Sequence, residues 1–423
     1  MKKRNIFTRA AIALAVIAIV MSAVSCISVK PPLLEKEGMS HEKLDLIDSL
    51  FKAYTLFELD DEALMDAVLK GYVEGTGDKY AEYFTAEEYE KLTSENRGET
   101  VGIGISVIQN AEKECIEIIN VVPDSPALAA GLQPGDLITY VGIGEDRQAV
   151  SELGYTNALD LLVGEKGTTA EITVFRPEEN GGKELEFSIV REKVTAVSVT
   201  CRVCETDPKV GVVRITGFDL TTPNQFSEAV DELVAKGCDR FVFDVRYNPG
   251  GDLLSIQAVL SYFLNENDVF IRTADRNKKT EELKIEAVTY SGDYSTCSVA
   301  EKDIGKYRDL RFAVLTNGST ASAAELFTSA LKDYGLGIVV GETTYGKGTM
   351  QSTYSLTPYG YSGALKLTTR YYFPPISESY DGIGIAPDVE VELDEALAGK
   401  NIYKITDAED NQLRAAIEEL YKK

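Results

Sequence analysis

The sequence predicts a multidomain α/β protein with an N-terminal helical segment, a β-rich domain that carries two helices, and an α/β core. Three observations predict this organisation. The chain has 423 residues, 44% apolar and 26% charged, which suits two or three globular domains. Its hydrophobic period changes from helical to strand-like at Gly98, and strands alternate with helices beyond Arg191.

Composition narrows the function classes. The chain has 43 Lys and Arg against 68 Asp and Glu, so its net charge of −25 disfavours nucleic acid as a partner. It contains one histidine, His41, which we interpret as an exposed polar residue. No HExxH or three-histidine zinc motif is present, and we expect no metal site. If the protein is a hydrolase, its base is something other than histidine.

Residues 1–25 are typical of an export signal. Four basic residues precede the apolar run Ala10–Val24, which is shorter than the ~20 residues of a spanning helix, so a cleaved signal peptide is favoured. Ala23-Val24-Ser25 before Cys26 resembles a bacterial lipobox, in which Cys26 would be lipidated. An uncleaved anchor and simple cleavage after Ser25 remain open. Each alternative predicts an extracytoplasmic protein of the cell envelope, tethered to the membrane or secreted.

Residues 26–97 form a linker and a helical region. Leu44, Ile47 and Phe51 share one helical face, a second helix follows Asp60-Asp61, and Thr85-Ala-Glu-Glu88 has capping-box spacing before a third. At the other end of the chain, residues 401–423 contain an amphipathic helix over 407–421.

Residues 98–192 form the β-rich domain. Strands are expected at 101–107, 115–122 and 137–141, a helix at 156–163, and a hairpin turning at 180–182. The loop Val101-Gly-Ile-Gly-Ile105 and the run AAGLQPGD, which ends at Asp136, resemble the PDZ family. The resemblance implies that a peptide carboxylate binds backbone N–H groups around Gly102, Ile103 and Gly104 while the peptide extends an edge strand. A glycine-rich turn without a ligand is the alternative.

Residues 193–400 form the α/β core, with strands expected at 210–215, 240–245, 311–316 and 336–340 and helices at 224–236, 253–264 and 321–334. The segment Asn317–Glu325 joins a buried strand to a helix. Backbone N–H groups at a helix start can stabilise the oxyanion of acyl transfer. Four hydroxyl residues there are candidates for the nucleophile, namely Thr316, Ser319, Thr320 and Ser322. We expect Thr320 or Ser319 to cap the helix instead.

Lys347 lies between two glycines downstream of this segment. Burial at such a position would lower the lysine pKa from ~10.4 toward the ~7–8 that a general base requires. Without a usable histidine, a Ser-Lys dyad is the simplest nucleophile–base pair that these residues can form.

The motifs together resemble the C-terminal processing proteases, also called tail-specific proteases, which are serine endopeptidases with a PDZ domain. The segments that carry the resemblance are residues 77–84, 244–251, 317–325, 346–351 and 382–388. The resemblance implies Ser322 as nucleophile, Lys347 as base and Gln351 as the residue that orients the lysine. It further implies an oxyanion hole from the N–H of Ala323 and of Gly250 or Gly251, and no metal or organic cofactor.

The implied function is cleavage of protein or peptide substrates recruited by their free, apolar C-termini. An inactive PDZ adaptor on a protease scaffold is the alternative. An activator protein, a homo-oligomer and membrane attachment through the anchor or a lipid are further expectations. Since i and i+4 on a strand lie ~13 Å apart, a contact between Lys347 and Gln351 requires a bend near Gly348.

Several polar residues keep two interpretations. Asp244 and Arg246 are expected to form a salt bridge or to support the following turn rather than to act in catalysis. Arg176 either couples the PDZ domain to the active site, as the resemblance suggests, or is an exposed arginine. Cys201 and Cys204 have CxxC spacing without a second ligand pair, so a short strand is the simpler interpretation.

Overall fold

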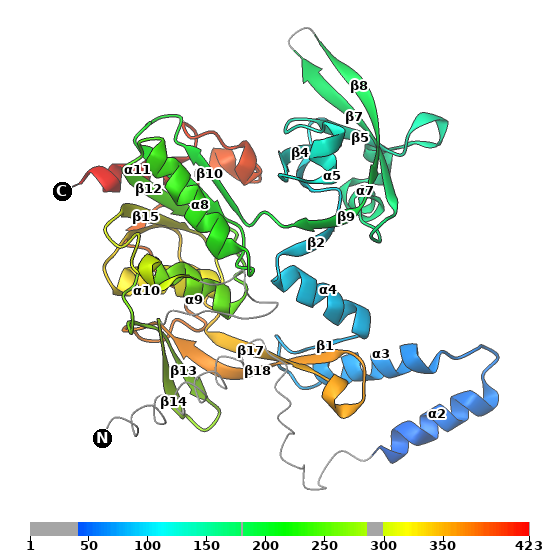
Figure 1. Cartoon of the computed structure of the whole chain (residues 1–423). Helices are drawn as coiled ribbons and strands as arrows, with labels where there is room; N and C mark the ends of the chain where they lie inside the picture. The colour runs from blue at the N-terminus through cyan, green and yellow to red at the C-terminus, as the bar shows by residue number, and fades with distance from the viewer. Residues whose placement is uncertain (1–40, 179–180, 286–298, 423) are drawn as a thin grey trace, which may run out of the picture. The chain divides into compact units, whose positions relative to one another are not determined.

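The computed structural model describes residues 41–178, 181–285 and 299–422 (Figure 1). The predicted export segment, Cys26, the first residue of the predicted 180–182 turn and Cys297 lie outside these residues. The chain divides into two compact units. One contains the chain up to Leu92 together with residues 275–279 and 349–371, and the other contains the rest.

The first unit combines the N-terminal helices with a small antiparallel sheet. Its helices are α2 (Glu42–Tyr54) and α3 (Asp61–Glu74), and it also holds the first turns of α4 (Ala86–Asn96). Strand β1 (Glu82–Phe84) pairs with β18 (Ala364–Phe373), which also pairs with β17 (Thr349–Ser355). The predicted capping box of α4 is confirmed, because Thr85 and Glu88 exchange hydrogen bonds of 2.9 and 3.3 Å.

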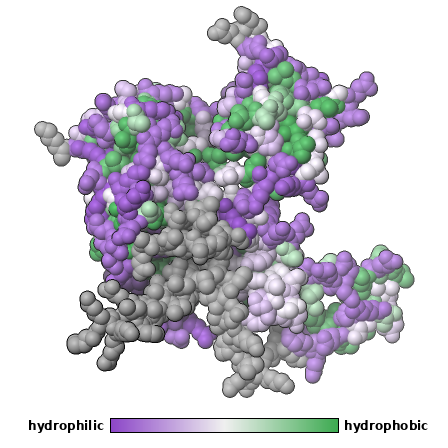
Figure 2. Space-filling view, in the orientation of Figure 1, coloured by the Kyte–Doolittle hydropathy of each residue, from purple (hydrophilic) through white to green (hydrophobic). Residues whose placement is uncertain are grey.

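The two N-terminal helices have little core of their own. Asp60 caps α3 by accepting from the N–H groups of Glu62 and Ala63. Helix α2 has no buried residue, and α3 buries only Val73. Figure 2 shows hydrophobic surface exposed over these helices. A helix of this length is marginally stable without packing. Large apolar side chains are therefore left at the surface of both helices, among them Leu50, Phe51, Tyr54, Met65 and Tyr72.

The second unit begins with the β-rich domain, whose sheet has the order β3-β4-β5-β7-β8, with β3 at the edge. The strands are β3 (Ile105–Asn110), β4 (Cys115–Val121), β5 (Leu137–Val141), β7 (Thr169–Glu178) and β8 (Gly181–Val190). Helices α5 (Pro126–Ala130), α6 (Val150–Leu153) and α7 (Tyr155–Leu162) accompany them, with β6 (Gln148–Ala149) beside β5. Strands β2 (Glu99–Gly102) and β9 (Glu192–Thr195) pair antiparallel where the chain enters and leaves.

The strand predicted over 101–107 is wrong in one respect, because it is broken after Gly102. Gly104 has a φ of +86°, and a Cβ at this position would lie 2.3 Å from that of Ser125. This close approach turns the chain from β2 into β3, which a two-residue period cannot reveal.

The core is a six-stranded sheet of order β10-β11-β12-β15-β16-β19, parallel except for the β10–β11 pair. The predicted α/β class is thus confirmed. Its strands are β10 (Val199–Val203), β11 (Val210–Ile215), β12 (Arg240–Asp244), β15 (Arg311–Thr316), β16 (Ile338–Gly341) and β19 (Val389–Glu390). The helices are α8 (Thr222–Ala235), α9 (Leu253–Ser261), α10 (Ala323–Asp333) and α11 (Asn411–Tyr421).

Alternate side chains of the central strands build two separate cores. Val242 of β12 belongs to the cluster covered by α11, with Leu413, Ala416 and Leu420. Its neighbour Phe243 points to the opposite face and contacts rings of the other helices, including Phe226 and Phe327. The hairpin of β13 (Val269–Asp275) and β14 (Thr280–Lys284) was not predicted, nor was that of β17 and β18.

Candidate active site

The predicted catalytic residues of the second unit follow three neighbouring strands. Residues 248–251 come after β12, Ser322 after β15 and Lys347 after β16, and these strands lie side by side and parallel. The carboxyl ends of parallel strands meet at one edge of a sheet, which is where α/β proteins place their ligands. The topology therefore gathers residues that are up to 99 positions apart in the sequence, counting from 248 to 347.

Ser322 is held in an uncommon backbone conformation. It stands immediately before α10 with φ +57° and ψ −120°, so it takes the N-cap position that we predicted for Thr320 or Ser319. A non-glycine residue in this region costs about 1–3 kcal/mol and needs support from its surroundings. The support comes from both sides, since Ala321 donates its N–H to Asn248 O (2.9 Å) and Ser322 donates its N–H to Glu325 (2.9 Å).

Two of the other hydroxyls of this segment are used structurally, whereas Ser319 is exposed. Thr320 is fully buried, donates to Val245 O (2.9 Å) and accepts from the N–H of Asn317 (3.0 Å). Thr316 donates to Glu342 O (2.8 Å). These bonds fix the loop between β15 and α10 and leave Ser322, which is half-buried, as the hydroxyl at the strained position.

Glu325 joins the serine segment to the lysine segment. One oxygen of its buried carboxylate, Oε2, accepts from the N–H groups of Ser322 (2.9 Å) and Lys347 (2.8 Å). The other, Oε1, accepts from Gly346 N–H and the Thr344 hydroxyl, both at 2.6 Å. Burial raises the pKa of Glu325, while the Thr344 hydroxyl and the three N–H groups act in the opposite direction. The Ser-x-x-Glu spacing from Ser322 to Glu325 is that of a capping box and is the sequence signal for such a contact.

The glycines on either side of Lys347 are required by packing, and Lys347 itself is half-buried. A Cβ at Gly346 would lie 2.7 Å from Gly384 N, and one at Gly348 would lie 2.6 Å from the Cβ of Asp381. The Tyr372 hydroxyl donates to Lys347 O. The lysine backbone is thus fixed from opposite sides by a carboxylate and a phenol.

The predicted oxyanion donors fall into two groups. Ala323 is the first residue of α10, so its N–H has no carbonyl one turn back. Gly250 packs against Ser322, because a Cβ there would lie 2.7 Å from Ser322 Cβ and 2.8 Å from Ala323 N. Its own N–H, however, donates to Asn248 Oδ1 (2.8 Å), which corrects its predicted use as a donor. Of the two glycines offered for the hole, Gly251 therefore remains.

Gln351 lies in the first unit, on β17, opposite Thr368 of β18. A register shift between Met350 and Gln351 interrupts the ladder of β17 and β18. The Gln351 amide nitrogen donates to the hydroxyls of Thr368 and Thr349, both at 3.2 Å.

Asp244 and Arg246 form the salt bridge that the sequence predicted, at 2.9 Å. Both side chains are buried, and Arg246 also binds Asp410 (2.7 Å), which caps α11. Burial acts to raise the pKa of Asp244, but Arg246 and Arg214 together bring it well below its usual range. The pair anchors the C-terminal helix beside β12.

In the β-rich domain, the structure places the three predicted carboxylate-binding residues between β2 and β3. The Ile103 side chain is buried in the domain core, and its carbonyl accepts from Ala127 N–H (2.8 Å), whereas the Ile105 side chain stays partly exposed. Gly102 is open to the surroundings. Arg176 is not simply an exposed arginine, because it binds buried Asp136 with two bonds of 2.6 and 2.7 Å.

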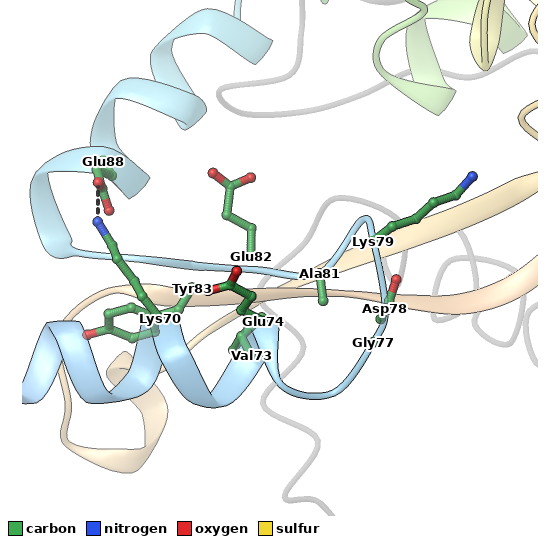
Figure 3. A pocket seen from close by; sticks show the side chains of 10 residues that line it. All are labelled: Lys70, Val73, Glu74, Gly77, Asp78, Lys79, Ala81, Glu82, Tyr83 and Glu88. Atoms are coloured by element: carbon green, nitrogen blue, oxygen red, sulfur yellow. Dashed lines mark hydrogen bonds and ion pairs between the residues drawn. The ribbon is translucent and has the colours of Figure 1, made fainter.

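The first unit has an open pocket of about 500 Å³ between α3, the 77–82 loop and the start of α4 (Figure 3). It is lined by charged groups, including Lys70, which pairs with Glu88 at 2.7 Å. None of the predicted catalytic residues lines it. Within the described ranges, no group of three or more His, Cys, Asp or Glu could hold a metal ion. Cys201 and Cys204 are free thiols that lie within and just after β10.

Comparison with known proteins identifies the β-rich domain and the α/β core separately. Residues 91–174 match the PDZ domain, and residues 209–391 match peptidase family S41. The carboxy-terminal-processing protease of Bartonella bacilliformis is 31% identical, over 79% of this chain and 70% of that protein. The carboxy-terminal processing protease CtpA of Bacillus subtilis is 28% identical, over 82% and 69%.

The fold and the site define a serine-type peptidase with an α/β core and a PDZ domain. The chain belongs to peptidase family S41, among the carboxy-terminal processing proteases. The fold alone is shared with the crystal structure of a putative S41 protease from Bacteroides fragilis, at a TM-score of 0.51, 18% identity, and coverage of 89% of this chain and 96% of that one.

Proposed function

We propose that the protein is an endopeptidase in which Ser322 is the nucleophile and Lys347 the general base. The observation that carries this assignment is the single Glu325 oxygen that binds the N–H groups of both residues. In the proposed reaction, neutral Lys347 takes the Ser322 proton as Oγ attacks the scissile carbonyl. The N–H groups of Ala323 and Gly251 donate hydrogen bonds to the oxyanion, and the lysine then protonates the leaving amine.

Substrate recruitment is assigned to the PDZ domain. Strand β3 is the edge of its sheet, so a peptide can extend the sheet by pairing with it. The chain around Gly102, Ile103 and Gly104 precedes this strand, where backbone N–H groups would meet a terminal carboxylate. A free, apolar C-terminus is the substrate feature that this arrangement favours.

The protein is further proposed to work outside the cytoplasm, either attached to the membrane through residues 1–25 or a lipid on Cys26, or secreted after cleavage of the signal peptide. In the part of the chain that the structure describes, no helix is long and apolar enough to cross a membrane. The apolar side chains exposed on α2 and α3 support a homo-oligomer. An activator protein would act on a resting form of the enzyme.

The test is cleavage of an unstructured reporter with a free apolar C-terminus. Ser322→Ala and Lys347→Ala should each lower the rate by at least about 1,000-fold with an unchanged melting temperature. Ser319→Ala, a hydroxyl three residues away, is the control and should retain activity. Retained cleavage in both dyad variants would reject the assignment, and binding without cleavage by the wild-type protein would identify an adaptor.

Recruitment is tested separately by amidating the reporter's C-terminus. At limiting substrate, kcat/KM should fall because the amide cannot replace the carboxylate. An unchanged value would reject the PDZ role while leaving the dyad in place.

A further inference from the structure

Asp78 belongs to the first unit and is one of the residues that line the pocket of Figure 3. Its Oδ2 accepts from the N–H of Thr368 (2.8 Å), and its Oδ1 accepts from the Thr368 hydroxyl (2.9 Å) and from Tyr80 N–H (3.1 Å). Burial opposes ionisation, but the hydrogen bonds from Thr368 and Tyr80 bring the pKa of Asp78 below its ordinary value. The side chain is therefore an acceptor-only group at neutral pH.

This acceptor dictates the direction of the next hydrogen bond. A threonine hydroxyl has one proton, and that of Thr368 is donated to Asp78. Toward Gln351 the same oxygen can then only accept, and it receives the amide nitrogen of Gln351 at 3.2 Å. The second amide proton has Thr349 Oγ1 (3.2 Å) and O (3.4 Å) as acceptors.

The direction of this hydrogen bond matters because a glutamine amide has an acceptor at one end, its oxygen, and a donor at the other, its N–H₂ group. With its nitrogen committed to Thr368 and Thr349, the amide carbonyl is left as the group that can accept from a lysine. If the amide were turned over, its N–H₂ group would be the one available to the lysine. Such a donor cannot bind a charged ammonium group, and it would occupy the lone pair of a neutral amine. A role of Gln351 in orienting Lys347 thus requires one of two amide orientations.

We propose that Asp78 is a positioning residue for catalysis, which acts through Thr368 to set the amide orientation of Gln351. The proposal rests on the proposed function and on the role that the resemblance implies for Gln351, which is to orient Lys347. It gives a catalytic purpose to a side chain in the segment before the PDZ domain, 269 residues away from Lys347 along the chain (78 to 347).

The first experiment is a double-mutant cycle on kcat and KM with the same reporter. In Asp78→Asn one of the two oxygens that accept from Thr368 becomes an amide nitrogen. A single remaining oxygen cannot hold both the N–H and the hydroxyl of Thr368 as the carboxylate does, which frees the hydroxyl to turn its proton toward Gln351 and the amide to turn over. We expect kcat to fall roughly tenfold to a hundredfold with little change in KM. In a Gln351→Ala background the same substitution should have no further effect. An equal loss in both backgrounds would overturn the proposal.

Two further variants separate positioning from folding. Thr368→Ser keeps the hydroxyl and should retain activity, whereas Thr368→Val should reproduce the loss of kcat even if the Asp78 variant folds poorly. Asp66→Asn is the matched control, since Asp66 lies in the same unit and accepts from Tyr83 (2.8 Å) but takes no part in this chain of bonds. A loss of kcat in the Asp66 variant equal to that of Asp78→Asn would reject the proposal.

A readout without catalysis distinguishes this proposal from the proposed function. The side-chain amide signals of Gln351, measured on ¹⁵N-glutamine-labelled protein and assigned by their absence in Gln351→Ala, report its hydrogen bonds directly. They should shift in Asp78→Asn and Thr368→Val but not in Thr368→Ser or Asp66→Asn. If wild type is inactive, only the proposed function fails. If these signals do not respond to Asp78→Asn, the positioning proposal fails, whatever the activity.

Discussion

The N–H groups of Ser322 and Lys347 donate to the same oxygen atom, Glu325 Oε2, at 2.9 and 2.8 Å. Residues that are 25 positions apart are thereby held at one point (322 to 347). The carboxylate belongs to the first turn of the helix that begins after Ser322, so the fold of α10 and the positions of Ser322 and Lys347 depend on the same group.

Glu325→Gln should impair both activity and stability. One carboxylate oxygen becomes an N–H₂ group that faces two donors, either Ser322 and Lys347 or Gly346 and Thr344. Each buried donor left without an acceptor costs about 1–3 kcal/mol, and a displacement of about 1 Å in the dyad costs about 100-fold in rate. Thermal unfolding and kcat measure the two effects. Glu228→Gln, exposed on α8, should change neither.

Gly250→Ala should inactivate the enzyme through a steric clash. The added Cβ would approach Ser322 Cβ to 2.7 Å and Ala323 N to 2.8 Å, at a φ of +105°. Gly237→Ala is a matched control, because its φ is +90° but a Cβ there would meet nothing within 4 Å. Both variants should lose about 1–2 kcal/mol of stability from the backbone strain, and only Gly250→Ala should lose cleavage. Equal activities would contradict the packing role of Gly250.

Asp252 should make stability depend on pH. Burial raises the pKa of this helix cap to about 6, and Asp219 adds to the effect, while the N–H groups of Ser255 and Leu254 lower it. The pKa of Asp252 in the folded protein lies above its unfolded value of about 3.9. The contribution of Asp252 to the free energy of unfolding is therefore most favourable below pH ~4 and becomes less favourable as the pH rises to ~6.

Asp252→Asn should therefore raise the melting temperature at pH 7.5 but not at pH 4, since asparagine caps helices as well as aspartate does. The gain in unfolding free energy should be up to about 3 kcal/mol. Asp309→Asn, at an exposed position, is the control. A gain of equal size at both pH values would exclude the titration of Asp252 as its cause.

Asp410→Ala should loosen the C-terminal helix. It removes the cap of α11 and one of the carboxylates that pair with buried Arg246. Breaking a buried ion pair in this way costs about 3–5 kcal/mol. Urea unfolding measures the loss, and Glu418→Ala, exposed on the same helix, should be close to wild type. A loss below 1 kcal/mol would show that Asp244 alone suffices for Arg246.

The sequence by itself determined the order of the domains, the α/β class and most core strands. Strands 210–215 and 311–316 were predicted to the residue, because buried β-branched runs bounded by turns leave few alternatives. The resemblance to the C-terminal processing proteases led to a family that the comparisons confirm. The dyad assignment to Ser322 and Lys347 stays a prediction that the geometry supports.

Only the tertiary structure decided what depends on contacts between distant segments. Three features arise where the loops that follow three strands come together. They are the backbone strain at Ser322, the hydrogen bond from Gly250 N–H to Asn248, and the pair of hydrogen bonds that one Glu325 oxygen accepts. Local periodicity carries no information about contacts between distant segments. The hairpin of β17 and β18 was missed for the same reason. Its half-buried residues have no strong pattern, yet it brings Gln351 opposite Thr368 and places Thr368 within reach of Asp78, 290 residues away (78 to 368).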